Sequence, residues 1–424
     1  MPEELGPSAW KQTSLDGLAE YINGFAFTDS YWSNEGLPIV RIAQITGSQG
    51  IVDRYQGLLS DTFRLTDGDL IFSWSGTLAV VRWNGGPAWL NQHLFKVIPR
   101  KGVDRDLLFH LLQASVAEMD KRTHGSTMKH IKRGELRDFI VSVPVEADEQ
   151  RALARVLDAL DGKIRQTEAI IKKLKQVKQG LLHDLLTRGI DANGELRPPQ
   201  SEAPHLYKES PLGWIPREWE AGMLADWLEG RPKNGYSPQP AGRWTGIQML
   251  GLGCLTATGF QPRQLKDAPA GDPLVKPAFL APGDLLMSRA NTRELVGMVG
   301  TYRDIGTPCC YPDLMMKLTP NSRTSAMFLE LVLGAPAARR QIQASASGTS
   351  GSMVKISSDI VMSLSIAAPC LDEQHCMLNF VSAYDERIRL ELESCKQLSA
   401  VKSGLMDDLL TGRVRVTSLI DTAP

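Results

Sequence analysis

Two stretches of the chain carry apolar residues at alternating spacings of four and three. They are Leu153, Leu157, Leu160, Ile164, Ile171, Leu174, Leu181 and Leu185, and then Met377, Val381, Tyr384, Ile388, Cys395, Leu398, Leu405 and Leu409. This spacing is typical of a helix with one apolar seam, as in coiled coils. The sequence therefore predicts two helices of about 40 residues, each about 60 Å long.

Polar residues interrupt both seams at equivalent places, Thr167 and Lys178 in the first and Glu391 and Lys402 in the second. Seams of equal length with matching interruptions predict that the two helices pack on each other. A glycine near the end of each helix, Gly180 or Gly404, costs about 1 kcal/mol there. We therefore expect a close helix or partner contact at these glycines.

The two helical stretches are copies of one segment. Asp148-Glu149-Gln150 recurs as Asp372-Glu373-Gln374, and residues 180–187 recur at 404–411, so both pairs share an offset of 224 (372 − 148 and 404 − 180). Between 148–187 and 372–411, 17 of 40 pairs are identical, far above chance. Asp148 and Asp372 follow strand-like segments with proline and are predicted N-caps.

The repetition extends upstream, in the same order in both halves. The matches are residues 68–73 with 283–288, residues 125–129 with 351–355, and Trp10 and Leu15 with Trp219 and Leu224. We therefore predict an α+β protein with two similar mixed α/β domains. Two long helices, packed as an antiparallel coiled coil, join them as a pseudo-twofold duplication. The predicted segments are domain 1 (1–147), helix 1 (148–188), a Pro- and Gly-rich linker (189–216), domain 2 (217–371), helix 2 (372–412) and a tail (413–424).

Composition and charge narrow the class of protein. Lys and Arg number 47 against 48 Asp and Glu, so total charge does not favour nucleic acid. Residues 121–137 are locally basic, with Lys121, Arg122, Lys129, Lys132, Arg133 and Arg137 against Glu135. No apolar run reaches the roughly 18 residues of a membrane helix, and the first residues do not resemble a secretion signal. We expect a cytoplasmic protein that does not contact membrane.

The six cysteines form no C-x-x-C pair and have no histidine at zinc-ligand spacing. We expect free, mostly buried thiols, although the adjacent Cys309 and Cys310 leave a redox role open. The chain lacks a phosphate-binding G-x-x-x-x-G-K-[ST] loop and the Asn-Pro-Pro-aromatic or Asp-Pro-Pro-aromatic motif of adenine methyltransferases. Gly251-Leu252-Gly253 lacks the third glycine of a dinucleotide site. We therefore expect no enzyme: no catalytic residue, no metal and no cofactor on this chain.

An Asp-Glu-Gln start and a Gly-Leu-(Leu/Met)-x-Asp-Leu-Leu-Thr end, both present twice, resemble the conserved helical regions of type I restriction-modification specificity subunits. Residues 213–219 (GWIPREW) look like that family's entry to its second target-recognition domain, and residues 36–42 and the Gly-Asp-Leu turns fit its domain interior. The family's Pro-Leu-Pro run before each helix is degenerate here. Ala290-Asn291-Thr292 also departs from the Ser-Gly-Thr pattern of residues 75–77.

The resemblance implies a DNA reader without chemistry of its own. Each domain would read one half of a split, asymmetric target in double-stranded DNA. The helices would set the spacing and dock two modification subunits, which carry the methyltransferase and bind S-adenosylmethionine. Restriction subunits with translocase and nuclease activity would add to that complex.

Candidate contacts follow from the repeats. Lys129 and Lys355 each follow a Gly-Ser turn that suits a phosphate, and Lys132 and Arg133 extend this surface. Ser73 and Trp74 lie opposite Arg289 and Asn291, whose side chain types bind guanine and adenine edges bidentately. The predicted DNA-binding set is Ser73, Trp74, Lys129, Lys132, Arg133, Arg289, Asn291 and Lys355. The predicted partner contacts are Leu181, Leu185, Leu405 and Leu409.

Basic residues along the first helix, from Lys163 to Lys178, either face DNA or a partner or form a solvated surface. Two other functions remain open from sequence. One is a related split-site system in which a fused partner both methylates and cleaves. The other is a duplicated coiled-coil scaffold that binds only protein, which DNA binding with a salt-dependent affinity would exclude.

Overall fold

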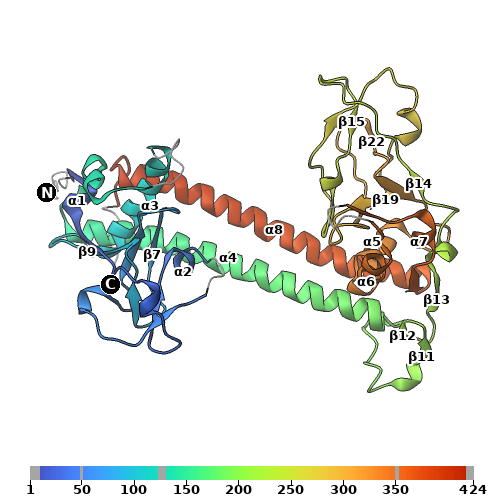
Figure 1. Cartoon of the computed structure of the whole chain (residues 1–424), viewed down its shortest axis with the longest axis horizontal. Coiled ribbons are helices and arrows are strands. Elements are labelled where there is room, and N and C mark those ends of the chain that lie inside the picture. Colours follow the sequence, from blue (N-terminus) through green and yellow to red (C-terminus); the bar gives the residue numbers. More distant parts are fainter. Residues whose placement is uncertain (1–9, 48–50, 123–129, 349–352, 417–424) are drawn as a thin grey trace, which may run out of the picture. The chain divides into compact units, whose positions relative to one another are not determined.

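The computed structural model describes residues 10–47, 51–122, 130–348 and 353–416. The chain divides into two compact units, of which unit 1 is residues 1–170 with 391–424 and unit 2 is residues 171–390. Each unit holds one mixed α/β domain and a part of each long helix, α4 (Ala147–Arg188) and α8 (Leu371–Leu410) (Figure 1). No helix in the described ranges is long and apolar enough to span a bilayer.

Unit 1 is built on two four-stranded sheets and one strand pair. The first sheet has the order β2 (Ala19–Asn23), β9 (Leu94–Pro99), β6 (Leu70–Ser73), β7 (Ala79–Arg82), and the second β4 (Arg54–Tyr55), β3 (Leu37–Val40), β8 (Ala88–Leu90), β5 (Arg64–Leu65). The pair is β1 (Trp10–Ser14) with β10 (Ile140–Pro144). The helices are α1 (Leu15–Leu18), α2 (Ile42–Thr46), α3 (Arg105–Arg122) and the 3-10 turns η1 (Asp29–Tyr31), η2 (Asp61–Phe63) and η3 (Arg133–Asp138).

Unit 2 repeats this topology. Its main sheet has the order β14 (Lys233–Asn234), β23 (Met315–Leu318), β19 (Leu285–Ser288), β21 (Val299–Thr301), and its second sheet β18 (Lys266–Asp267), β15 (Gln248–Met249), β22 (Cys309–Cys310). The β15–β22 pair is parallel, as is β3–β8 of unit 1. Three pairs are β13 (Glu220–Met223) with β25 (Ser365–Ala368), β16 (Leu255–Thr256) with β17 (Gly259–Phe260), and β20 (Ala290–Asn291) with β24 (Val354–Lys355). The helices are α5 (Ala326–Gly334), α6 (Pro336–Ser345), α7 (Ser358–Met362) and the 3-10 turns η4 (Pro204–Leu206), η5 (Leu224–Trp227), η6 (Leu252–Cys254) and η7 (Lys276–Ala278).

The repeated Gly-Asp-Leu motif builds the same turn before β6 and β19. Gly68 and Gly283 have φ angles of +92° and +95°, a left-handed conformation that glycine adopts without steric cost. The next residue, Asp69 or Asp284, accepts a hydrogen bond from the backbone N–H three positions upstream, at 2.8 and 2.9 Å. The turn therefore needs glycine and aspartate, whereas the buried strand that follows tolerates exchange among apolar residues.

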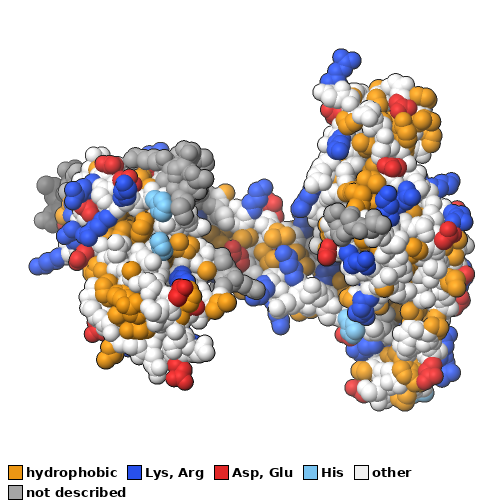
Figure 2. Space-filling view, viewed as in Figure 1, with side chains coloured by type: hydrophobic (Ala, Val, Ile, Leu, Met, Phe, Trp, Pro, Cys, Tyr) orange, Lys and Arg blue, Asp and Glu red, His pale blue; other side chains and the backbone are white. Residues whose placement is uncertain are grey.

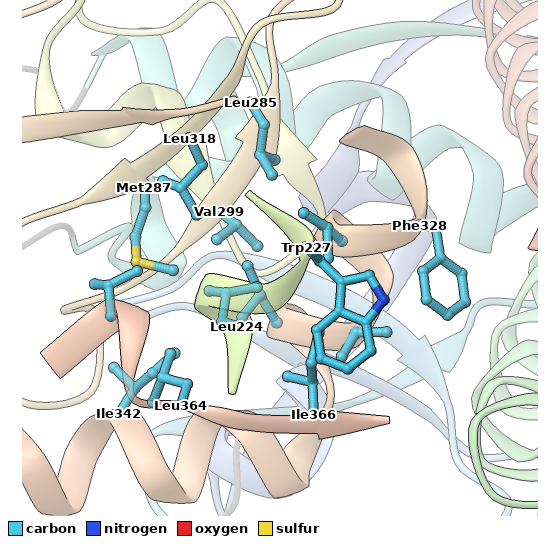
Figure 3. Close-up of a cluster of buried hydrophobic side chains, with 14 of the residues drawn as sticks. Leu224, Trp227, Leu285, Met287, Val299, Leu318, Phe328, Ile342, Leu364 and Ile366 are labelled. Carbon is cyan, nitrogen blue, oxygen red and sulfur yellow. The ribbon is translucent and has the colours of Figure 1, made fainter. Parts of the chain in front are cut away.

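Each domain has its own core, closed by one end of a long helix. In unit 2, Leu285, Met287 and Val299 from the main sheet pack with Trp227 and Phe328 (Figure 3). Ile366 and Leu364, from the strand before α8, close that core. Met377 and Val381 of α8 and Leu185 of α4 join the same cluster. The end of each seam is therefore part of a domain core, and only its middle is left to pair helix with helix.

Two of the four polar interruptions of the seams, Lys178 and Lys402, form ion pairs between the two helices. In unit 1, Lys402 of α8 binds Asp161 of α4 at 2.6 Å, and in unit 2 Lys178 of α4 binds Asp385 of α8. Asp385 is Asp161 plus 224, and Lys402 is Lys178 plus 224. The two bridges are therefore one interaction copied by the duplication. In both pairs the residue numbers sum to 563, as an antiparallel pairing requires, so the predicted antiparallel coiled coil is confirmed.

The Asp-Glu-Gln motif anchors the start of each long helix. The helices begin at Ala147 and Leu371, so Asp148 and Asp372 lie in the first turn and not at the N-cap as predicted. In the first turn these carboxylates lie near the positive end of the helix dipole, which favours acidic residues there as an N-cap would.

The glutamate of the motif lies in a buried ion pair. In unit 2, Glu373 accepts hydrogen bonds from Arg197, at 2.6 and 3.0 Å, and from the Trp219 indole at 3.0 Å. In unit 1, Glu149 binds Arg415 at 2.7 and 3.0 Å and the Trp10 indole at 3.3 Å. Arg197 and Arg415 each follow the C-terminus of the opposite long helix. The start of one helix is thereby fastened to the end of the other within each unit.

The glutamine of the motif binds backbone of the domain that precedes its helix. Gln150 donates to the carbonyls of Pro144 and Gly102 and accepts from the N–H of Asp104. Gln374 repeats this with Pro369 and with the start of α5. Both side chains are almost fully buried. The motif therefore fixes how each helix leaves its own domain.

The structure also bears on two other predicted features, the glycines near the helix ends and the linker. A Cβ at Gly180 or Gly404 would meet nothing within 4 Å, so no contact of the described chain requires these glycines. The predicted linker is ordered, since β11 (Tyr207–Ser210) and β12 (Gly213–Pro216) pair as an antiparallel hairpin. Gly213 and Pro216 belong to β12, and Pro204 begins η4.

Candidate DNA interface

The predicted contacts of the first domain meet where β6 ends. We call residues 73–75 and 130–133 the first strand-end site. The Ser73 hydroxyl is buried and donates to the Ser75 carbonyl at 3.3 Å. Ser75 forms a β-bridge with His130, and the N–H of Ile131 donates to the Trp74 carbonyl at 2.9 Å. Ser73 therefore shapes the backbone and does not present its hydroxyl to a ligand.

Trp74 is the centre of an aromatic group at this site. Its ring lies 5.9 Å from His93, 5.8 Å from His130 and 5.8 Å from Phe95. Both histidines are exposed, while the Trp74 indole N–H is buried without a hydrogen-bond partner in the described chain. Lys132 and Arg133 are exposed beside this group. The site thus combines an aromatic surface with imidazole and cationic groups.

The equivalent place in unit 2 has different chemistry. We call residues 288–291, 347 and 354–356 the second strand-end site. Ala290 pairs with Lys355, and the N–H of Ile356 donates to the Arg289 carbonyl at 3.0 Å. The Arg289 and Lys355 side chains make no hydrogen bond or ion pair with the described residues. The strand pairing therefore brings together two cationic groups, Arg289 and Lys355, with the Asn291 amide.

The strand pairing corrects one predicted correspondence. Ser75 pairs with His130 and Ala290 pairs with Lys355, so the counterpart of Lys355 is His130. The prediction matched Lys355 with Lys129, one residue earlier, because both are lysines after a Gly-Ser turn. Lys129 itself lies outside the described residues.

Basic residues elsewhere divide into free and paired groups. Lys and Arg side chains are scattered over the visible faces of both units (Figure 2). Arg137, from the basic run, binds Asp16 at 3.1 Å, and Lys178 is used in the helix pair. Of the basic residues from Lys163 to Lys178, those exposed are Lys163, Arg165, Lys172, Lys173 and Lys175.

The leucines predicted to contact a partner are needed by the chain itself. Leu185 and Leu409 retain only 1% and 2% of their surface, and Leu181 and Leu405 pack partly against the same cores. Sequence periodicity could not separate these roles, because one apolar seam serves both the domain cores and the helix pair. Apolar residues that do face outward on the long helices are Ile170, Val177, Phe380, Leu390, Leu392 and Val401.

One cluster in unit 1 has residue types that bind metals. The ligand atoms of His110, Asp158 and Asp161 lie within 4.8 Å of one another. Burial lowers the pKa of His110, opposed by its hydrogen bond to Asp158 at 2.8 Å. Arg82 binds Asp158 at 2.8 Å, and Lys402 binds Asp161. Because the chain's own cations already neutralise both carboxylates, the cluster is a buried network that joins α3, α4 and α8.

All six cysteines are free, as predicted, but only three are buried, so the expectation that most are buried was wrong. Burial raises the pKa of Cys309 to about 12 and that of Cys310 to about 11, so neither forms the thiolate that redox chemistry needs. Adjacency alone therefore gives these two no redox role.

We expect Cys309 and Cys310 to resist alkylation in the native protein at pH 8, because that pH lies well below both pKa values. The exposed Cys370 and Cys376 should react within minutes. Mass spectrometry after iodoacetamide treatment measures this, and unfolding in urea should make all six thiols reactive. Rapid native labelling of Cys309 would contradict the buried environment.

Comparison with known proteins links this geometry to one group. Residues 7–176 match the family model described as the type I restriction modification DNA specificity domain. The chain is 21% identical over 382 residues to the MjaVIII specificity subunit of a type I restriction enzyme from Methanocaldococcus jannaschii, covering 87% of this chain and 84% of that protein. A putative MjaX specificity subunit from the same organism is 22% identical, with 97% and 96% covered.

Solved structures show the same fold at lower identity. The S subunit of a type I restriction-modification system from M. genitalium superposes with a TM-score of 0.55 at 12% identity, covering 96% of this chain and 98% of that one. A chain from a study of complex assembly in a type I system gives 0.55 at 16% identity, with 96% and 99% covered. The predicted fold class, two mixed domains joined by long helices, is confirmed.

Proposed function

Because the chain belongs to the specificity subunits of type I restriction-modification systems, we propose that it reads DNA for methyltransferase and restriction activities carried on other chains. Its role is DNA sequence specificity within a restriction-modification complex. We propose further that it has no catalytic centre of its own and that S-adenosylmethionine binds to the partner methyltransferase. The chain would then supply positions and contacts and no reacting group.

The two domains, in this proposal, read different half-sites. The observation that carries this is the unequal chemistry of two places with the same strand pairing. The first strand-end site offers Trp74, His130, Lys132 and Arg133, whereas the second offers Arg289, Asn291 and Lys355 within a matched strand pairing. Arginine and asparagine suit guanine and adenine edges, and aromatic or imidazole groups do not replace them. A split, asymmetric target follows.

The long helices would set the spacer between the half-sites and bind two methyltransferase subunits. Val177 and Val401 support this role, because they occupy equivalent positions of the duplication (177 + 224) and both expose a third or more of their surface. Two identical partners need two equivalent surfaces, which a duplicated helix provides. A restriction subunit would join this assembly, unless one fused partner both methylates and cleaves.

The test is a methylation map of a methylation-free bacterial host that expresses this chain with its cognate methyltransferase subunit. We expect one split motif, with methyl-adenine in each half and different sequences in the two halves. The host with methyltransferase alone is the control and should show no such motif. A motif that persists without this chain, or methylation that never appears with it, would contradict the proposed function.

A further inference from the structure

Unit 2 has an insertion at the point where its strand-end site leaves the main sheet. In unit 1, Ser73 pairs with Ala79, which leaves five residues between them, 74–78. In unit 2, the N–H of Ser288 donates to Met298 at 2.8 Å, which leaves nine, 289–297. The flanking strands otherwise correspond, so unit 2 carries four extra residues (9 − 5). We call residues 289–297 the long turn.

Two arginines join the long turn to helix α6, one from the helix and one from the turn. The Arg339 guanidinium donates to the carbonyls of Val296 at 2.7 Å and Glu294 at 2.9 Å. From the turn itself, Arg293 donates to the Gln343 carbonyl at 2.8 Å. Val296 is fully buried in the core of unit 2. Polar contacts and burial therefore fasten the same stretch of backbone.

The backbone of the long turn is also fixed by its own geometry. Gly297 has a φ angle of +70°, and a Cβ there would lie 2.5 Å from a methyl carbon of Ile342 in α6. The N–H of Val296 donates to the Thr292 carbonyl at 2.8 Å, which closes a helical turn. The side-chain oxygen of Asn291 accepts from the N–H of Thr292 at 2.9 Å. The Asn291 amide group is thereby oriented before any ligand binds.

We propose that the long turn is the base-reading element of unit 2, and that Arg339 is a positioning residue that holds it in shape for the major groove of DNA. This rests on the proposed function and adds to it which segment of unit 2 reads bases. Discrimination between bases depends on side chains held within about 0.5 Å of a productive geometry. Arg339 supplies this support for Arg289 and Asn291 without contacting DNA itself.

The test compares Arg339→Gln with Arg340→Gln in the same methylation assay. Arg340 is the next residue of α6, is exposed and makes no hydrogen bond or ion pair with the described residues, so it is a matched control. We expect Arg339→Gln to lower discrimination at one or more positions of one half-site by about tenfold, since a good bidentate contact is worth that much or more. The other half-site should keep its preference, and Arg340→Gln should match the wild type.

A merely structural role for Arg339 would lower methylation at all sites without changing base preference, and that result would overturn the inference. Unchanged base preference in both half-sites would also overturn the inference. If Arg339→Gln fails to fold, Asn291→Ala decides, because Asn291 is partly exposed and its loss should relax the same half-site only. A wild-type chain that directs no motif would instead contradict the proposed function, which keeps the two failures distinct.

Discussion

Replacing Glu373 with alanine is expected to lower the free energy of unfolding of unit 2 by about 3–5 kcal/mol, because it leaves a buried guanidinium without its counter-charge. The side chains of Arg197 and Glu373 are only 7% and 9% exposed. Burial alone would lower the pKa of Arg197, but the hydrogen bonds and charge of Glu373, aided by Glu218, outweigh it and raise that pKa. Without Glu373 the guanidinium still keeps its proton, as arginine does in proteins, so Arg197 cannot avoid the penalty by becoming neutral.

The same arginine offers a matched control. Glu218 also binds Arg197, at 2.9 Å, but its side chain is 79% exposed. Glu218→Ala should therefore cost less than about 1 kcal/mol, as exposed ion pairs do. Urea unfolding, with hydrogen exchange of the β19 amides to localise the loss to unit 2, measures both variants. Equal effects of the two substitutions would show that burial does not decide the strength of this contact.

The duplicated residue in unit 1 provides an internal comparison. Glu149 is as buried as Glu373, but its partner Arg415 is 29% exposed and can regain water when the glutamate is removed. Duplication has thus preserved the glutamate while the environment of the arginine has diverged.

The sequence predicted the parts of the fold that depend on periodicity and repetition. The seam residues identified both long helices, and the offset of 224 predicted that polar residues such as Lys178 and Lys402 are equivalent. The sequence could not reveal that Lys178 and Lys402 pair with Asp385 and Asp161, because both aspartates lie off the apolar seam. Spacing identifies which face of a helix is apolar, but not which polar neighbours reach across from another helix.

The candidate site was predicted less completely. Arg289, Asn291 and Lys355 do meet, because β20 pairs with β24 through Ala290 and Lys355. The match of Lys129 with Lys355 was displaced by one residue, since residue type cannot set the register of a strand pair. The four-residue insertion in the long turn was also missed. Insertions in connections leave no periodic signal, and Arg339, which holds the turn, is distant in sequence.

Exchanging residues 1–144 for the first domain of another specificity subunit is expected to change one half of the methylated motif and leave the other half intact. The junction at Pro144 lies where β1 and β10 close the domain, before the helix begins. Apolar contacts cross this junction where Leu153, Leu157 and Leu409 of the long helices join the core of the first domain, and the following polar contacts also cross it. They are Trp10 with Glu149, the backbone of residues 102–104 with Gln150, Arg82 with Asp158, and Gln113 with Lys402.

This exchange should succeed only if the incoming domain keeps groups equivalent to Trp10 and Arg82, because Glu149 is buried and Asp158 lies in the buried network of unit 1. The reciprocal exchange of residues 217–368 should change the opposite half of the motif. Methylation maps of both chimaeras measure this directly. If either exchange altered both halves, base reading would depend on the two domains jointly. The two units would then not read DNA independently, even though each has its own core and its own strand-end site.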